Sequence, residues 1–165
     1  MSGKIDPINS RNYGAITANL IVKDLNAAVS FYKNAFGFAE RGGVMNGPDG
    51  KPVHAELRLR DSTLMLSPEN PARGMKSAST MGGSPITLYM LTEDVDATVA
   101  RAVKLGARAD GQVMDMFWGD RSGTVVDPNG YSWMISTHVA EPTEQEMKKK
   151  MAEQMGAQAS GAVGS

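Results

Sequence analysis

The sequence predicts an α+β fold built from two copies of one βαβββ unit. Residues 16–29 align without a gap on residues 86–99, with five identical positions. Each copy is an apolar strand pattern, an Asp and an amphipathic helical pattern that ends at Gly37 or Gly106. Three further alternating runs follow each helical pattern. A repeat of this length in a chain of 165 residues indicates one supersecondary unit used twice around a shared core.

The first copy reads as a strand at 15–22, a helix at 25–36 and three more strands. Asp24 is a suitable N-cap for the helix, and Gly37 is a suitable stop. Turn residues separate the later strands, and a tight turn is expected at Asp61-Ser62. The three later strands are expected at 38–45, 53–60 and 62–67.

The second copy follows a linker, 68–85, that is rich in Pro, Gly and Ser. The pattern predicts a helix at 95–105 capped by Asp94, and a hairpin turn at 127–130. The repeats, 15–67 and 86–138, are expected to form a single domain that spans 13–139. The strands of the second copy are expected at 86–92, 108–117, 121–127 and 131–138.

The C-terminal segment after Pro142 predicts one more helix, at 142–156. Met147, Met151 and Met155 are four residues apart and share one face, which we expect to pack on the body of the protein or on a partner subunit. Small and polar residues at 157–165 predict a disordered tail.

The composition is that of a globular protein, with 41% hydrophobic and 21% charged residues. A net charge of −1 favours neither nucleic acid nor an anionic membrane as a partner. The absence of cysteine excludes disulfides, thiolate nucleophiles and Cys-ligated zinc, and is typical of a cytoplasmic protein. No apolar run approaches the ~20 residues that cross a bilayer, and residues 1–7 lack a signal-peptide core.

Side chains alternate along a strand, so each strand has one face toward its helix and one toward the cleft between the units. In the first unit the leucines at 57, 59, 64 and 66 indicate the helix side. In the second unit we expect Trp133 and Ile135 to share the helix side with Thr124 and Val126. The candidate residues of the cleft are then Thr17, Asn19, His54, Glu56, Arg58, Met65, Tyr89, Arg121, Val125 and Met134, with His138 at the margin.

His54, Glu56 and Arg58 form the most polar run on the cleft side. They suit acid–base chemistry, with Arg58 holding the Glu56 carboxylate and His54 titrating near neutral pH. The alternative is an ion pair on an exposed strand.

Arg121 and Trp118 also have two interpretations each. The guanidinium of Arg121 suits an anionic group on a ligand, or a structural ion pair. Trp118 suits the wall of a site for a planar ligand, or a plug at the end of the cleft.

Two sets of motifs stand out. The first set is Asp24-Leu25, Ala28, Phe31-Tyr32, Phe36-Gly37 and Asp127-Pro128-Asn129-Gly130. The second set is His54-Ala55-Glu56-Leu57-Arg58, Phe117-Trp118-Gly119-Asp120-Arg121-Ser122-Gly123, Asp127-Pro128-Asn129-Gly130-Tyr131-Ser132-Trp133 and Thr137-His138. The first set resembles the vicinal oxygen chelate superfamily, the glyoxalase/bleomycin-resistance/extradiol-dioxygenase fold, and the second is similar to its PhnB-like branch. The resemblance covers residues 13 to about 155 and implies a half-open barrel and a homodimer.

The metal-dependent members of that superfamily hold a divalent ion on His, Gln and Glu side chains from the first and last strand of each unit. The matching positions here are Thr17, Met65, Thr87 and Met134. Hydroxyl and thioether groups are poor ligands for such ions. We therefore expect no glyoxalase-type metal centre and no cofactor. An unconventional site on His54 and Glu56, with Asn19 or His138, is the alternative.

Three functions follow from these observations. The first is binding of a small organic molecule in the cleft without a metal. The second is a lyase, isomerase or dioxygenase-type enzyme of the same superfamily, with Glu56 as general base, Arg121 as electrostatic clamp and His54 beside them, or with an unconventional metal. The third is a scaffold whose C-terminal helix docks a partner. The residues expected to line the cleft are Thr17, Asn19, His54, Glu56, Arg58, Met65, Tyr89, Trp118, Arg121 and Met134.

Overall fold

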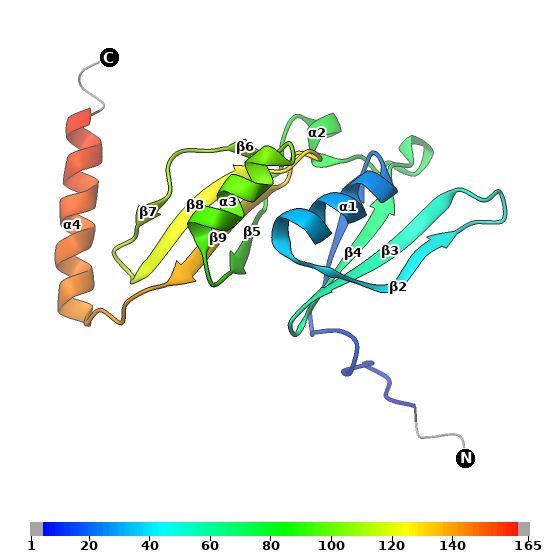
Figure 1. The fold of residues 1–165 in the computed structure, drawn as a ribbon, viewed down its shortest axis with the longest axis horizontal. Coiled ribbons are helices and arrows are strands. Elements are labelled where there is room, and N and C mark those ends of the chain that lie inside the picture. The colour runs from blue at the N-terminus through cyan, green and yellow to red at the C-terminus, as the bar shows by residue number, and fades with distance from the viewer. Residues whose placement is uncertain (1–4, 162–165) are drawn as a thin grey trace.

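The computed structural model describes residues 5–161 and shows two αβ units side by side. Figure 1 shows the helix of each unit in front of its own sheet, so the helix-free faces of the two sheets point to the same side. Over the described residues the two sheets do not close into a barrel. The α+β fold with two related units is confirmed.

The first unit is a four-stranded sheet in the order β1-β4-β3-β2 with one helix packed on it. Strand β1 runs parallel to β4, and the other neighbours are antiparallel. The elements are β1 (Ala18–Val22), α1 (Leu25–Phe36), β2 (Ala39–Asn46), β3 (Pro52–Leu59) and β4 (Ser62–Pro68).

The second unit repeats this arrangement with one difference. The expected strand at 108–117 is two short strands, because Asp110-Gly111 is a turn sequence and Gly111 has a left-handed φ of 88°. The sheet order is β5-β9-β8-β6, and β7 also pairs with β8. The elements are β5 (Thr87–Leu91), α3 (Val95–Lys104), β6 (Arg108–Ala109), β7 (Met114–Asp115), β8 (Asp120–Val126) and β9 (Ser132–His138).

The helix caps are equivalent in the two units, as the repeat predicts. The carboxylate of Asp24 accepts a hydrogen bond of 2.9 Å from the backbone N–H of Ala27. Asp94 accepts the same bond, also 2.9 Å, from Ala97. Each cap satisfies an N–H group that the first turn of a helix leaves unpaired.

The core lies between the helices and the sheets and runs through both units. The aromatic rings of the first unit meet Trp133 of the second, and the centroids of Phe36 and Trp133 are 4.9 Å apart. Tyr32, with no exposed surface, lies 5.6 Å from Trp133 in the same cluster. Such aromatic contacts hold the two units in a fixed relation.

The linker contains two short structured segments, a 3₁₀ turn at Pro71–Arg73 and helix α2 (Ala78–Met81). Glu69 accepts hydrogen bonds from the backbone N–H and the hydroxyl of Ser77, at 2.8 and 2.6 Å. The N–H of Ser79 donates to the carbonyl of Asn129 at 2.7 Å. The linker is therefore attached to the last hairpin turn of the second unit.

Helix α4 (Glu144–Gly161) lies beside β7 at the outer edge of the second unit (Figure 1). Gln154 on α4 donates a hydrogen bond of 2.9 Å to the carbonyl of Asp115. The helix continues past the expected end at 156 to Gly161, and 162–165 of the expected tail lie outside the described residues. Within residues 5–161 no helix is long and apolar enough to span a membrane.

Candidate functional site

The β3–β4 hairpin places His54, Glu56 and Arg58 on the helix-free face of the first sheet. Leu57 pairs with Leu64, and both are buried on the helix side. The tight turn is Arg60-Asp61, one residue earlier than expected, because Leu59 pairs with Ser62. A turn of two residues at either place gives the same faces, so the expected faces of this hairpin are confirmed.

Register brings four side chains into one row across this face. Asn19 on β1 pairs with Met65 on β4, Met65 pairs with Glu56 on β3, and Glu56 pairs with Arg41 on β2. The expected site residues Asn19, Met65 and Glu56 are therefore neighbours.

Glu56 is held by groups from three places in the chain. Its carboxylate accepts a hydrogen bond of 2.6 Å from the hydroxyl of Tyr13 and one of 2.9 Å from Nη1 of Arg41. Nε2 of His54 lies 3.5 Å from Oε1. The guanidinium of Arg41 also lies over the ring of Tyr13, 5.0 Å from its centroid. The ion-pair partner of Glu56 is therefore Arg41, which the sequence did not indicate.

The expected pair of Arg58 with Glu56 is wrong. Nε of Arg58 donates a hydrogen bond of 3.0 Å to the carbonyl of Arg60 instead. The side chains of Arg58 and Glu56 share a face but are two positions apart on one strand, about 7 Å along the chain, so Arg58 reaches the turn more easily.

A cavity of about 360 Å³ lies beside Glu56. It opens at a bulge in β2, where Gly42 and Gly43 both have left-handed φ values near 78° and 76° and the register with β3 shifts. Its lining consists of Tyr13, Arg41, Gly42, Gly43, Met45, His54 and Glu56.

The carboxylate of Glu56 is a weaker base than a free glutamate. Burial raises its pKa, but the hydrogen bonds from Tyr13 and His54 and the charge of Arg41 outweigh burial and leave the pKa lower than usual. A general base at neutral pH needs the opposite shift.

The β8–β9 hairpin corrects one expectation about the second unit. Trp133 pairs with Val125, and Ile135 pairs with Gly123. Three residues, 128–130, separate Asp127 from Tyr131, whose backbone groups bond at 2.9 Å. With an odd number of turn residues, the odd-numbered positions of the two strands share one face and the even-numbered positions share the other. The expected grouping of Trp133 with Thr124 is therefore wrong.

Arg121 and Val125 therefore lie on the helix side. Val125 is fully buried. Nε of Arg121 donates to Asp96 on α3 at 2.7 Å, and Nη1 donates to Asp115 at 2.9 Å. The expected position of Arg121 in the cleft is wrong, and its observed contacts are those of a structural ion pair between α3 and the sheet.

A polar cluster on the helix-free face of the second sheet centres on Asp120, which is 7% exposed. Its Oδ2 accepts hydrogen bonds from Tyr89 at 2.6 Å and from Nε1 of Trp118 at 2.9 Å. Nδ1 of His138 lies 2.8 Å from Oδ1, and Nε2 lies 2.9 Å from Glu141. The expected site residues Tyr89 and Trp118 are thus joined by the carboxylate of Asp120.

The protonation states in this cluster follow from these bonds. The hydrogen bond from Tyr89 lowers the pKa of Asp120 despite burial, and His138 contributes in the same direction. Asp120 and then Glu141 raise the pKa of His138 above its usual value of 6.5. The cluster therefore favours a charged carboxylate beside a charged imidazole.

The four positions that match the superfamily's metal ligands do not form a suitable ligand set. Met65 lies beside Asn19, Met134 pairs with Tyr89 and Thr124, and Thr87 pairs with Ser132. Among residues 5–161, no group of three or more His, Cys, Asp or Glu side chains is placed to hold a metal ion. Hydroxyl and thioether donors at these positions do not suit a hard divalent ion.

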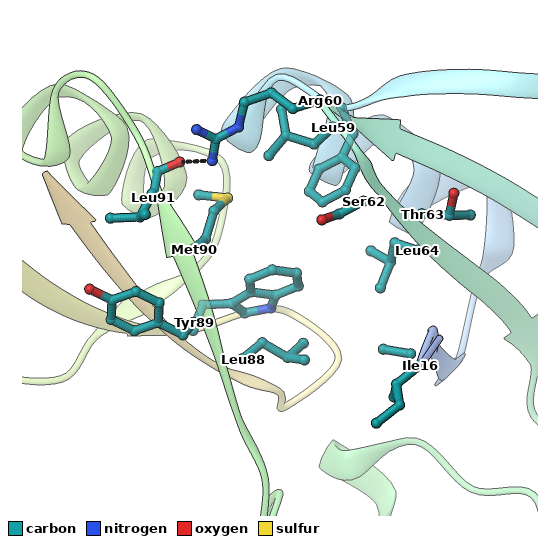
Figure 2. Close-up of a pocket in the computed structure, with 13 residues that line it drawn as sticks. Ile16, Leu59, Arg60, Ser62, Thr63, Leu64, Leu88, Tyr89, Met90 and Leu91 are labelled. Carbon is teal, nitrogen blue, oxygen red and sulfur yellow. Dashed lines mark hydrogen bonds between the residues drawn. The ribbon is translucent and has the colours of Figure 1, made fainter. Parts of the chain in front are cut away.

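A second cavity, of about 330 Å³, lies where the edges of the two sheets meet; we call it the seam pocket. Figure 2 shows Leu88 and Met90 of β5 on one side of it and Leu59 and Leu64 on the other, with Arg60 across the rim. Nη2 of Arg60 donates a hydrogen bond of 2.7 Å to the carbonyl of Leu91. The lining consists of Ile16, Ala18, Phe38, Leu59, Arg60, Ser62, Thr63, Leu64, Leu88, Tyr89, Met90, Leu91 and Trp133.

Tyr89 is the expected site residue that lines the seam pocket, while His54 and Glu56 line the cavity at the bulge. The sequence did not indicate Leu88 and Met90 as site residues. They lie on the helix side of β5, where the side chains were expected to pack in the core. The sequence did not indicate Arg60 either, because the turn was expected one residue later and Arg60 was expected at the end of a strand.

Comparison with known proteins agrees with this architecture. The family model described as "Glyoxalase/Bleomycin resistance protein/Dioxygenase superfamily" matches residues 12–135. An uncharacterised protein of Mycobacterium tuberculosis is 39% identical over 143 residues, which cover 85% of this chain and 84% of that protein. An uncharacterised protein of Arabidopsis thaliana is 32% identical over 116 residues, 66% of this chain and 69% of that protein.

Solved structures share the fold. The structure of an Arabidopsis thaliana gene product has a TM-score of 0.59 at 29% identity and covers 75% of this chain and 98% of that one. A glyoxalase/bleomycin resistance protein/dioxygenase family enzyme from Burkholderia phytofirmans has a TM-score of 0.60 at 20% identity, covering 74% and 97%. With the paired units and the match over most of its length, the chain belongs to the glyoxalase/bleomycin resistance protein/dioxygenase superfamily.

Proposed function

We propose that this protein binds a small organic molecule in the seam pocket without a glyoxalase-type metal centre. The observation that carries the proposal is the pocket itself, an apolar hollow of about 330 Å³ between the two units. Ligand sites of proteins begin at about 300 Å³ and are lined mainly by apolar side chains with a few polar groups. The seam pocket has this composition, with Arg60, Ser62, Thr63 and Tyr89 as its polar members.

The position of the pocket supports the proposal. Strands β1 and β5 are the edge strands of their sheets, and the pocket lies between them. Ile16 and Ile86, at equivalent positions before these strands, are 93% and 65% exposed. Exposed apolar side chains beside a hollow are typical of a site that a ligand or another chain covers.

The chemistry of the residues supports the metal-free part of the proposal. Thr17, Met65, Thr87 and Met134 offer no carboxylate and no imidazole at the positions where metal-dependent relatives carry them. Glu56 already has Tyr13, Arg41 and His54 around it.

We also propose three finer features that the sequence led us to expect. The proposal places the chain in the PhnB-like branch, on the motifs at 54–58 and 117–123. It includes a homodimer, which the exposed isoleucines support, and a cytoplasmic location, which the absence of cysteine supports.

The direct test is a titration of the purified protein, treated with EDTA, with the neutral fluorophore N-phenyl-1-naphthylamine. We expect saturable binding to the native protein. Leu88→Trp fills the pocket and should weaken binding about tenfold or more, while Val103→Trp, at a 42% exposed position on α3, should change it less than about twofold. Thermal unfolding of each variant shows that it is folded. Equal binding by all three proteins would contradict the proposal.

A second candidate is an enzyme that uses Glu56. The cavity of about 360 Å³ beside Glu56 and His54 favours it. The lowered pKa of Glu56 and the position of Arg121 on the helix side weigh against it. In this case Glu56→Gln abolishes turnover of a substrate and leaves binding of N-phenyl-1-naphthylamine unchanged.

A further inference from the structure

Arg60 has a backbone conformation that arginine seldom adopts. It is the first residue of the two-residue turn between β3 and β4 and has a φ of 52°. Within residues 5–161, Asn9 is the other non-glycine residue with positive φ. Glycine is the usual residue at such a turn position, since a Cβ atom costs about 1 kcal/mol or more there. Strain of this kind is often found at functional sites.

The strained turn carries the guanidinium to the rim of the seam pocket. Arg60 reaches from β3 across to the second unit, where Nη2 donates to the carbonyl of Leu91 (Figure 2). The same side chain lines a smaller hollow of about 240 Å³, together with Phe36, Thr92 and Glu93. Arg60 therefore lies between two adjacent openings.

The positive charge of Arg60 is not neutralised by an ion pair. Among the ion pairs between described residues none includes Arg60, although Glu93 lines the same small hollow. Its guanidinium donates to the neutral carbonyl of Leu91, which uses one of its five N–H donors. Arg60 is exposed, so the remaining donors are open to a ligand at the edge of the apolar pocket.

We propose that Arg60 selects the ligand of the seam pocket, and that this ligand is an organic anion with an apolar body, such as an aromatic or branched carboxylate or sulfonate. The inference rests on the proposed function of the pocket. The apolar body lies against Leu59, Leu64 and Leu88, and the anionic head accepts hydrogen bonds from Arg60 at the rim. A guanidinium binds carboxylates and sulfonates well, because its planar donors match two oxygen atoms.

The polar neighbours of Arg60 agree with this assignment. The hydroxyl of Ser62 donates to Asp61, its neighbour in sequence, and the hydroxyl of Thr63 donates to the carbonyl of Asn12. Tyr89 donates to Asp120, outside the pocket. Arg60 is therefore the group of the lining with unused donors and a full charge.

Two fluorophores with the same ring system separate the two proposals. N-phenyl-1-naphthylamine is neutral, and 8-anilinonaphthalene-1-sulfonate carries a sulfonate. We expect the native protein to bind the sulfonate at least about tenfold more tightly than the neutral compound. Arg60→Gln should remove this preference and leave the affinity for the neutral compound within about twofold. Arg121→Gln is the matched control, because Arg121 does not line the pocket and its guanidinium is paired with Asp96 and Asp115, and it should change neither affinity.

Two further variants keep the test independent of folding. Arg60→Lys keeps the charge but lacks the planar pair of donors, so it should retain only part of the preference. Arg60→Gly relieves the positive φ, so it should raise the melting temperature while the preference for the sulfonate is lost. A gain in stability with a loss of anion binding is a result that a purely structural arginine does not give.

The outcomes are distinguishable. If neither fluorophore binds saturably, the proposed function of the pocket fails. If both bind and Leu88→Trp weakens both, but Arg60→Gln leaves their ratio unchanged, the pocket stands and the role of Arg60 is overturned. If Arg60→Gly loses stability as well as binding, the arginine is structural and the inference is also overturned.

Discussion

Tyr32 donates a hydrogen bond of 2.6 Å to the carboxylate of Asp127, and both side chains are buried. The two residues belong to different units, since Tyr32 is on α1 and Asp127 follows β8. The other bonds of Asp127 come from Nε1 of Trp133 and from the backbone N–H groups of Asn129 and Tyr131. The Asp-Pro-Asn-Gly turn is thus also a contact that joins the units and fixes the geometry of the seam.

Tyr32→Phe should destabilise the protein by about 1–3 kcal/mol, because it leaves a buried carboxylate oxygen with one partner fewer. Urea unfolding followed by tryptophan fluorescence measures this change. Tyr13→Phe is a control for loss of a tyrosine hydroxyl at a less buried carboxylate, and it should cost less. Equal costs for the two variants would contradict the structural role of the Tyr32–Asp127 bond.

Gly130→Ala should be more damaging than Gly111→Ala. Both glycines have left-handed φ, 87° and 88°, so both substitutions carry the same backbone strain of about 1 kcal/mol. A Cβ at Gly130 would lie 2.4 Å from the backbone nitrogen of Ser79, whereas nothing lies within 4 Å of one at Gly111. We expect an additional loss of about 1–3 kcal/mol at Gly130 in chemical unfolding. A similar cost for both would show that the linker does not pack on the hairpin turn.

Glu69 should titrate at a pH of about 2 in the folded protein. Hydrogen bonds from the hydroxyls of Ser77 and Thr80 lower its pKa from 4.5 to about 2. Because the folded pKa is the lower one, Glu69 stabilises the protein above pH 4.5, and this contribution is lost as the pH falls from 4.5 toward 2. Carboxyl NMR titration measures the midpoint. The stability difference between the native protein and Glu69→Gln should shrink over the same interval, and a midpoint near 4.5 would refute the network.

His138 should keep its proton above pH 6.5, because Asp120 and Glu141 raise its pKa. A folded pKa above the unfolded value means that the stabilising contribution is complete below pH 6.5 and is lost as the pH rises through the folded pKa. Imidazole NMR titration gives this value. Glu141→Gln removes one of the two carboxylates and should lower it, while Glu144→Gln, on α4, should not. An unchanged midpoint in Glu141→Gln would contradict the contact.

Local features were predictable from the sequence. The caps Asp24 and Asp94 and the helix stop at Gly37 depend on residues within one turn, so the pattern alone places them. The faces of the β3–β4 hairpin followed from the alternation of leucines along its two strands. The length of the C-terminal helix was underestimated, because small polar residues after 156 weaken the helical pattern without ending it.

The faces of the second hairpin depended on whether the turn has an odd or even number of residues. Alternation on β8 is weak, since Arg121, Gly123 and Val125 share a face. The sequence therefore did not reveal that Arg121 belongs with Asp96 on the helix side. Val125 is the one hydrophobic side chain among these three residues, so the sequence pattern did not identify this face as the one toward the helix.

The contacts between distant segments were not predictable in the same way. Tyr13 reaches Glu56 from 43 positions away, and Arg60 reaches Leu91 from 31 positions away. Neither pair has a local pattern that brings it together. The seam pocket depends on how the edges of two sheets meet, which the strand pattern within each unit does not determine.

The central claim is that the seam pocket takes its ligand without a metal ion. Methyl NMR of the EDTA-treated protein, titrated with N-phenyl-1-naphthylamine, tests it most directly, because the chain has methionines at the pocket and on the helix-free faces. The account predicts saturable shifts for the methyl groups of Met90, Leu88 and Leu64, with Met65 and Met134 nearly unchanged. Shifts confined to Met65 and Met134, or binding that occurs only after a divalent metal is added, would contradict it.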